Sequence, residues 1–318
     1  MTMSFGKDLI MIKNRMLCCA DSALSNSLVW SRDRPEEEEL MVPLYTVKHM
    51  HRLIQKMFDR YKDKVLPGSA EGKTYFIHIE NGCPCHPIYI VGTFVVLLLA
   101  GVEKILIEYA GSYYNSTEYL YDPTVTFFVE EMAKSFPNIK MIKSIAEHQK
   151  HEVAISFVNK HPEITHVVDI GGQIDSYERL MKYRKDVCIH LPAANFIWVD
   201  YSSLRNLQQD KKLDSWGEKC RYGIIDYECF CMNYEDALYD LDFSPSHTYA
   251  NCYTWEEFWE EFIEWRLQRN VCDVMNIFCF GDGETPKLPD CDYRDRVRIV
   301  DGKDLVVNQM YYDFMDLL

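Results

Sequence analysis

The chain has 318 residues, of which 47% are hydrophobic, and a formal net charge of −15 at pH 7. This composition is that of a folded globular protein and excludes a disordered or fibrous chain, and the negative charge argues against a surface that grips nucleic acid broadly through phosphates. The chain has twelve cysteines, and its first residues do not have the pattern of a secretory signal. These two features predict a reducing compartment, where clustered thiols are more often metal ligands or buried side chains than disulfides.

The first 72 residues are predicted to form an N-terminal extension. They contain an apolar start with the adjacent Cys18 and Cys19, an acidic run at 32–40 that predicts a solvated loop or helix start, and a helix near 45–62. We expect the apolar start to be an ordinary packed segment. Contact with a membrane or a partner protein is the alternative.

From residue 73 onward, short apolar runs rich in β-forming residues alternate with helical stretches. The first run is TYFIHIE at 74–80, and a last helix and strand are recognisable within 254–283. The longest apolar run, 88–100, is well short of the roughly 20 residues that span a bilayer, so it is predicted to be a core helix. The alternation predicts one α/β body over residues 73–318, with a Rossmann-like parallel sheet and helices on both faces.

A glycine turn follows the predicted strand THVVDI at 165–170. Asp169 offers a carboxylate to the amine or hydroxyl groups of a ligand, and Gly171 and Gly172 let the backbone approach that ligand closely. The turn lacks the GxGxxG spacing of a dinucleotide site, so S-adenosylmethionine, which carries no phosphate, fits it better than NAD. A plain strand-to-helix turn would have the same local sequence.

Histidines and cysteines on either side of this turn are candidate site residues. His148 and His151 share one face of a predicted helix, where an imidazole can act as a nucleophile or a general acid–base, although two surface histidines would give the same pattern. Four later thiols can supply a tetrahedral zinc site of the structural kind, namely Cys188, Cys220, Cys229 and Cys231. Their spacing is irregular and contains no CxxC pair, so zinc ligation and buried free cysteines remain equal alternatives.

The order of these motifs resembles the capping domain of alphavirus-like RNA viruses, a methyltransferase-guanylyltransferase. The resemblance covers residues 148–283, and the order of its short motifs carries it. These motifs are HEVAISFV from His151, DIGG from Asp169, Cys188 four positions before Pro192, and Cys231 at the start of CMNYEDALYDLDF. Val158 stands where the family has an arginine, and Asp200 and Arg205 are the nearest matches to the family's acidic residue and arginine after the proline.

The resemblance implies a capping reaction on viral RNA. S-adenosylmethionine would lie over Asp169, Gly171 and Gly172, with Asp200 as a further acceptor, and its methyl group would pass to a guanine nitrogen of GTP. His151 would then attack the α-phosphorus of GTP, assisted by Mg²⁺, and hold the nucleotide until an RNA 5′ end accepts it. Zinc at the cysteines, contacts with other replicase proteins or a second copy, and a place in the host cytoplasm at membrane-bound replication sites are further implications.

Two alternatives remain open. In the first, another type of S-adenosylmethionine-dependent methyltransferase uses the turn after Glu80, with Gly82 in it and Glu108 on the next strand, and THVVDIGG is then the fourth strand of the same sheet. In the second, a methyltransferase fold without activity serves as an assembly or interaction module of a replicase, because a fold alone does not establish an activity.

Overall fold

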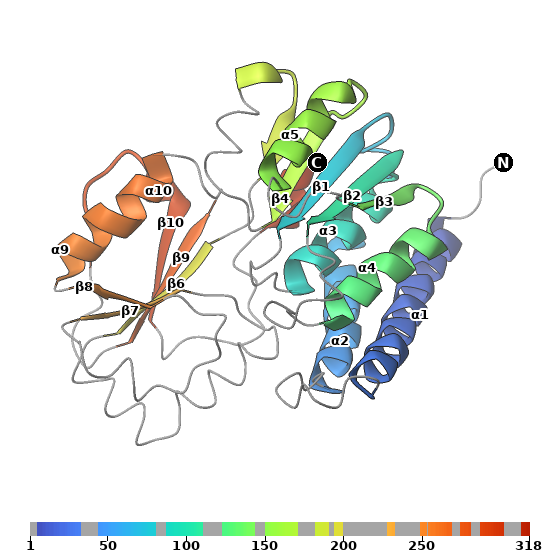
Figure 1. The fold of residues 1–318 in the computed structure, drawn as a ribbon, viewed down its shortest axis with the longest axis horizontal. Helices are drawn as coiled ribbons and strands as arrows, with labels where there is room; N and C mark the ends of the chain where they lie inside the picture. The colour runs from blue at the N-terminus through green and yellow to red at the C-terminus, as the bar shows by residue number, and fades with distance from the viewer. Residues whose placement is uncertain are drawn as a thin grey trace. The chain divides into compact units, whose positions relative to one another are not determined.

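A computed structural model describes residues 5–32, 44–80, 87–110, 123–143, 150–170, 182–190, 194–199, 228–232, 249–252, 254–268, 274–280, 287–301 and 313–318. Within these ranges the chain forms two compact units (Figure 1). The first comprises Met1–His190 with Phe314–Leu318, and the second comprises Leu191–Asp313.

The first unit is built around a parallel sheet of five strands in the order β3-β2-β1-β4-β5. Its elements, in chain order, are α1 (Phe5–Arg32), α2 (Leu44–Tyr61), β1 (Thr74–Glu80), α3 (Pro87–Leu99), β2 (Lys104–Ala110), α4 (Pro123–Ser135), β3 (Ile139–Lys143), α5 (Lys150–Lys160), β4 (His166–Ile170), β5 (Cys188–His190) and the C-terminal 3-10 helix η5 (Phe314–Leu317). The central strands are nearly continuous apolar runs because helices bury both of their faces.

Helices cover both faces of this sheet, so the predicted Rossmann-like α/β fold is confirmed. On one face, Phe76 of β1 and Val167 of β4 pack with Val158 of α5, and the Phe76 ring stacks on Phe157 of that helix at 5.4 Å. On the other face lie α3 and α4, as Figure 1 shows. Strand order reverses between β1 and β4, which makes the carboxyl edge of these two strands the switch point of the sheet.

The N-terminal helices belong to the first unit and do not form a separate extension. Helix α1 lies along α4, where the Arg15 guanidinium donates to the Ser135 carbonyl oxygen at 3.2 Å and lies 5.3 Å from the centre of the Phe136 ring. Helix α2 lies along α3 and buries Met50 and Ile54. No helix in the described parts of the chain combines the length and apolarity needed to cross a bilayer.

The C-terminal helix η5 returns to the first unit. The ring of Phe314 lies directly over Gly92 of α3, where an added Cβ would come within 2.4 Å of it. The amide of Phe314 donates to the Tyr61 hydroxyl at 3.1 Å, and the Tyr75 hydroxyl donates to the Leu317 carbonyl oxygen at 2.6 Å. The glycine at position 92 is therefore required for the close approach of this ring.

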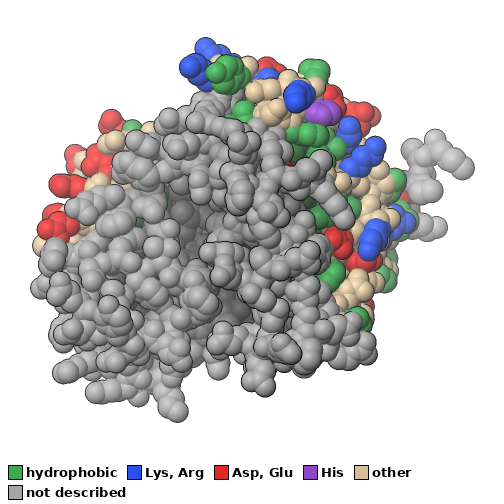
Figure 2. All heavy atoms as spheres, in the orientation of Figure 1, with side chains coloured by type: hydrophobic (Ala, Val, Ile, Leu, Met, Phe, Trp, Pro, Cys, Tyr) green, Lys and Arg blue, Asp and Glu red, His purple; other side chains and the backbone are tan. Residues whose placement is uncertain are grey.

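The second unit contains a second parallel sheet, in the order β10-β9-β6-β7-β8. Its elements are β6 (Ala194–Val199), β7 (Glu228–Met232), β8 (Tyr249–Cys252), α9 (Trp255–Phe258), the π-helical η2 (Trp259–Glu264), α10 (Trp265–Gln268), β9 (Met275–Phe280), the 3-10 helix η3 (Arg294–Arg296) and β10 (Val297–Asp301). Counted from its own first strand, this sheet has the same strand order as the first. Figure 2 shows acidic side chains gathered at the edge of the molecule where Figure 1 has α9. Glu256 of α9 and Glu260 of η2 are exposed.

The structure therefore divides the chain differently from the expected extension over 1–72 and single body over 73–318. In the described parts of the chain, ten strands form two sheets of five, and each sheet has its own buried core. An alternation of strands and helices along the sequence does not distinguish one large sheet from two smaller ones, because strand pairing depends on residues that are far apart in the sequence.

Candidate functional site

Three buried polar side chains lie in one row near the switch point of the first sheet. His78 of β1 pairs in register with Glu108 of β2 on one side and with Asp169 of β4 on the other. Residues in register on neighbouring parallel strands point to the same face, here the face that α5 covers. The exposed fractions are 4% for His78, 1% for Glu108 and 7% for Asp169. We refer to these three residues as the polar row.

The histidine of the polar row is held by a carboxylate. Nδ1 of His78 lies 3.1 Å from Oε2 of Glu108, and both side chains are almost completely buried. A carboxylate acceptor fixes the proton on Nδ1, which makes Nε2 the basic nitrogen of the ring. Burying such groups is costly and gives little net stability compared with apolar side chains of similar volume. The polar row therefore needs a reason other than stability.

The sheet topology also brings the start of α5 to this edge. Strand β3 runs parallel to β4, so the helix that joins them begins at the carboxyl edge and runs back toward the amino edge. His151 is the second residue of that helix, and its backbone lies at the same edge as the polar row; its side chain is outside the described residues.

The other predicted site residues fall in several places. Asp169 is the penultimate residue of β4 and belongs to the polar row. Cys229 and Cys231 are in β7 of the second unit, where only the backbone is described. Four predicted positions lie outside the described residues, namely Gly171, Gly172, Asp200 and Cys220. The predicted zinc site of four cysteines consequently stays a prediction.

Cys188 is at the amino edge of the first sheet, beside two histidines. It is the first residue of β5 and pairs in register with His166, the first residue of β4, and His190 follows two residues later on the same face. The candidate ligand atoms of these three side chains all lie within 4.8 Å of one another. Both histidines are neutral at pH 7, because burial lowers the pKa of His166 and of His190 to about 4, with Lys73 contributing to both shifts.

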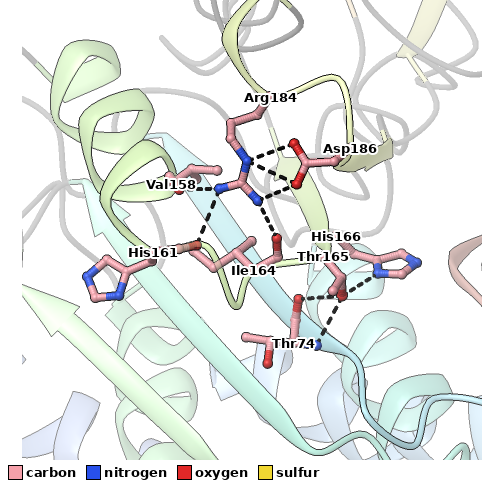
Figure 3. Close-up of polar contacts among 8 residues, drawn as sticks. All are labelled: Thr74, Val158, His161, Ile164, Thr165, His166, Arg184 and Asp186. Carbon is pink, nitrogen blue, oxygen red and sulfur yellow. Dashed lines mark hydrogen bonds and ion pairs between the residues drawn. The ribbon is translucent and has the colours of Figure 1, made fainter.

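An arginine fixes the chain between α5 and β5 (Figure 3). The Arg184 guanidinium donates to the carbonyl oxygens of Val158 at 2.6 Å and Ile164 at 2.8 Å, and it forms an ion pair with Asp186 at 2.9 Å. These carbonyls belong to the end of α5 and the turn into β4. A basic side chain at a helix C-terminus satisfies carbonyl groups that have no partner within the helix.

Sequence reasoning missed His78, His166 and His190, and it named Glu108 only in an alternative. The available signal was a polar residue inside an apolar strand, as in TYFIHIE and KILIEYA. One part of that alternative is confirmed, because β4 lies in the same sheet as β1 and β2. Its proposed turn at 81–86 is outside the described residues.

Comparisons with known proteins give no family. No family model matches the chain, and no curated protein matches it. A solved structure titled as a probable aldehyde dehydrogenase from Listeria monocytogenes EGD-e covers 92% of this chain and 81% of its own, with 10% identity and a TM-score of 0.46. A γ-glutamyl phosphate reductase from Saccharomyces cerevisiae covers 88% of this chain and 81% of its own, with 9% identity and a TM-score of 0.33.

The predicted function, a viral capping methyltransferase-guanylyltransferase, is contradicted. The segment 148–283 is divided between two sheets, with His151, Asp169 and Cys188 in the first unit and Cys231 in the second. Its motifs thus do not belong to the single sheet that the resemblance implied. The expectation of an S-adenosylmethionine-dependent enzyme stays a prediction, because the comparisons do not bear on methyl transfer.

Proposed function

We propose that the protein is an enzyme whose reaction centre is the carboxyl edge of the first sheet, with His78 as general acid–base. The observation that carries this proposal is the buried pair of His78 and Glu108, in register with Asp169 at the switch point. Open α/β sheets bind their ligands at this place, and buried titratable pairs in such clefts are typical of acid–base sites.

The three side chains have distinct roles in this proposal. Glu108 is a positioning residue that holds the imidazole through Nδ1–H and stabilises the positive charge when Nε2 takes up a proton. Asp169, on the opposite side of His78, supplies a carboxylate that can accept a hydrogen bond from a hydroxyl or amine of the ligand. A histidine placed in this way contributes about 10²–10⁴-fold to the rate of a proton-transfer step.

The ligand class follows from the charge and the position of the polar row. With a net charge of −15, the protein does not offer a broad surface for a polyanion, so we expect a small molecule that enters a local site. Its reacting group must gain or lose a proton next to Nε2 of His78. Hydroxy acids, carbonyl compounds and amines are the classes to test first, with nucleotides as a further class.

The test combines ligand screening with a matched pair of histidine variants. Imidazole NMR signals of the full chain are followed while each ligand class is added, and the His78 signals are assigned from the His78→Gln spectrum. A substrate should shift these signals. His78→Gln should lower kcat by about 10²–10⁴-fold with little change in KM, because the lost interaction acts in the proton-transfer step.

His161→Gln is the control, because His161 is a partly exposed histidine that also pairs with a carboxylate, that of Glu163 at 3.0 Å. It should leave kcat unchanged. A substrate that is turned over at the same rate by wild type and His78→Gln would contradict the proposal.

A further inference from the structure

We propose that His166, Cys188 and His190 form a zinc site at the amino edge of the first sheet. This site is at the opposite end of β4 from the polar row and on the opposite sheet face, so the proposal does not depend on the proposed function. Its geometric basis is the convergence of one thiol and two imidazoles, whose candidate ligand atoms all lie within 4.8 Å of one another.

Hydrogen bonding determines which nitrogen of His166 is available to a metal (Figure 3). The Thr165 hydroxyl donates to the Thr74 carbonyl oxygen at 3.1 Å and accepts from the Thr74 amide at 3.1 Å. A hydroxyl has only one proton, so when that proton is on the bond to Thr74, Nδ1–H of His166 donates in the 2.8 Å contact with the Thr165 oxygen. The lone pair of His166 is then on Nε2, as in metal-binding histidines whose other nitrogen donates to a neighbouring acceptor.

His190 supplies an independent observation. Its side chain is 7% exposed, and among the described residues its Nε2 atom has no hydrogen-bond partner. A buried polar atom without a partner costs about 1–3 kcal/mol. Ligation of a metal by Nε2 would remove this cost.

Neighbouring rings hold the two imidazoles in place. The ring of His166 stacks on Tyr75 at 4.5 Å on one side and on His190 at 5.6 Å on the other, with an angle of 4° between the two histidine planes. The Tyr75 ring is itself fixed by the hydrogen bond from its hydroxyl to Leu317. The ligands are thus largely preorganised before a metal arrives.

The ligand set indicates zinc. Imidazole nitrogen and thiolate sulfur are the ligands that zinc prefers, and three protein ligands leave the fourth tetrahedral position for water. The exposed Cys188 provides access from solvent, and its thiolate offsets part of the charge of Zn²⁺. The cation of Lys73 opposes metal binding, but its ammonium group donates to the main-chain oxygen of Leu318.

A metal at this place would also stabilise the first unit. Strand β5 is the edge strand, has only three residues, and is the last element of the first unit before the chain enters the second. A metal held by β4 and β5 would fix this short strand in its register. Zinc should therefore raise the thermal unfolding midpoint of the protein.

The experiment is metal titration of the full chain after treatment with a chelator. One zinc per chain should bind. Cobalt in place of zinc should give visible bands of tetrahedral intensity and a thiolate-to-cobalt charge-transfer band.

Cys188→Ser should abolish the charge-transfer band, and His166→Gln and His190→Gln should each abolish stoichiometric binding. Cys291→Ser, which changes a free cysteine of the second unit, and His161→Gln should bind as wild type does.

Thr165→Val tests the assigned tautomer without touching a ligand. Loss of the hydroxyl acceptor should weaken zinc binding by about 10–100-fold. If His190→Gln does not fold, the exposed Cys188→Ser variant still decides the outcome. The proposal is overturned if wild type binds less than stoichiometric metal, or if Cys188→Ser keeps full affinity and the charge-transfer band. Zinc binding that persists in Cys188→Ser would point instead to ligands elsewhere in the chain.

Discussion

The two sheets of this protein have the same strand order but different residues at the same place. In the first sheet, the register row through the penultimate residue of the fourth strand contains Glu108, His78 and Asp169. In the second sheet, the matching row through Cys279 of β9 contains Trp198, and its partner on β7 is Phe230. The three positions of the second sheet that match the polar row are therefore apolar, and Asp301 of β10 is next to Cys279 in register. Apolar residues at these three positions are compatible with this topology, so the fold itself does not require the polar row.

The side chains that pack around these two rows differ as well, with aromatic packing in the second sheet and polar groups in the first. In the second sheet, Trp198 is 4% exposed and packs at 4.9 Å from Phe258 and 5.4 Å from Trp255. Its face is filled by large aromatic side chains of the helix that leads into the fourth strand. In the first sheet, α5 packs on apolar side chains below the polar row but leaves three polar groups at the strand ends. The two sheets thus share this position in the fold, but the polar side chains at the three matched positions belong to the first sheet.

The largest expected effects test whether the two cores are independent. Phe314→Ala should destabilise the first unit and Trp198→Ala the second, each by about 3–5 kcal/mol, because both remove a buried aromatic ring. Five of the six tryptophans lie within 191–313, so tryptophan fluorescence reports on the second unit. Phe314→Ala should leave the fluorescence transition in place and shift a second transition seen by circular dichroism. A shift of both transitions by either variant would show a single cooperative unit.

The next effect is a pH dependence confined to the first unit. The pKa of His166 and of His190 is about 4 in the folded protein, below the ordinary value of 6.5, because the burial of His190 and the partial burial of His166 disfavour the charged imidazole. Between these values the unfolded chain binds more protons, so stability is complete above pH 6.5 and falls as pH falls toward 4. Between pH 7 and pH 5 the loss for the pair should be on the order of 3 kcal/mol in metal-free protein, with the share of the partly exposed His166 reduced by solvent screening.

Nine of the ten histidines precede Leu191, so the second unit should be nearly insensitive to this change. Denaturant unfolding at pH 7 and pH 5 measures the difference. Equal stability of the first unit at both pH values would contradict the assignment of two buried neutral histidines.

A smaller effect is expected from breaking the polar row at one residue. Glu108→Leu removes the acceptor of Nδ1 and leaves His78 buried beside it, which should cost about 1–3 kcal/mol. Glu108→Gln keeps a side-chain oxygen that can accept from Nδ1–H and should cost less. The comparison of their unfolding free energies separates loss of the hydrogen bond from loss of the charge. Equal stability of both variants and wild type would show that the contact has no energetic role.

The smallest effect concerns Arg184. Arg184→Lys keeps the charge but cannot reach the carbonyl oxygens at the end of α5 and in the turn to β4 together, so it should cost about 1 kcal/mol. Arg294→Lys, at an exposed position of η3, is the matched change in the second unit and should be close to neutral. Chemical denaturation of both variants provides the measurement.

Much of the fold could be predicted from sequence, because it follows from local patterns. Apolar runs such as 74–80 and 104–110 are strands, and the segment 88–100 is a buried helix, as expected. The placement of Asp169 at the end of a buried strand was also correct. These features depend on periodicity and strand length, which a single sequence displays directly.

The division into two sheets and the identity of the neighbours could not be predicted in the same way. His78 and Glu108 are 30 residues apart, and the zinc ligands His166 and Cys188 are 22 residues apart, so each pair depends on strand order and register. A one-residue shift in register would turn the side chains to the opposite face. Motif order alone therefore joined residues of two units into one supposed site.

The most direct test of the polar row is its replacement by the kind of residues that the second sheet has. The triple variant His78→Leu, Glu108→Met, Asp169→Cys makes the row apolar with similar volumes, and Cys is the residue that the second sheet has at position 279. If the polar row serves function, the unfolding free energy of this variant should be equal to that of wild type or higher by about 1–4 kcal/mol, while the response to ligands is lost. A loss of stability of about 3 kcal/mol or more would show that the polar row is part of the structural core, contradicting its assignment as a reaction centre.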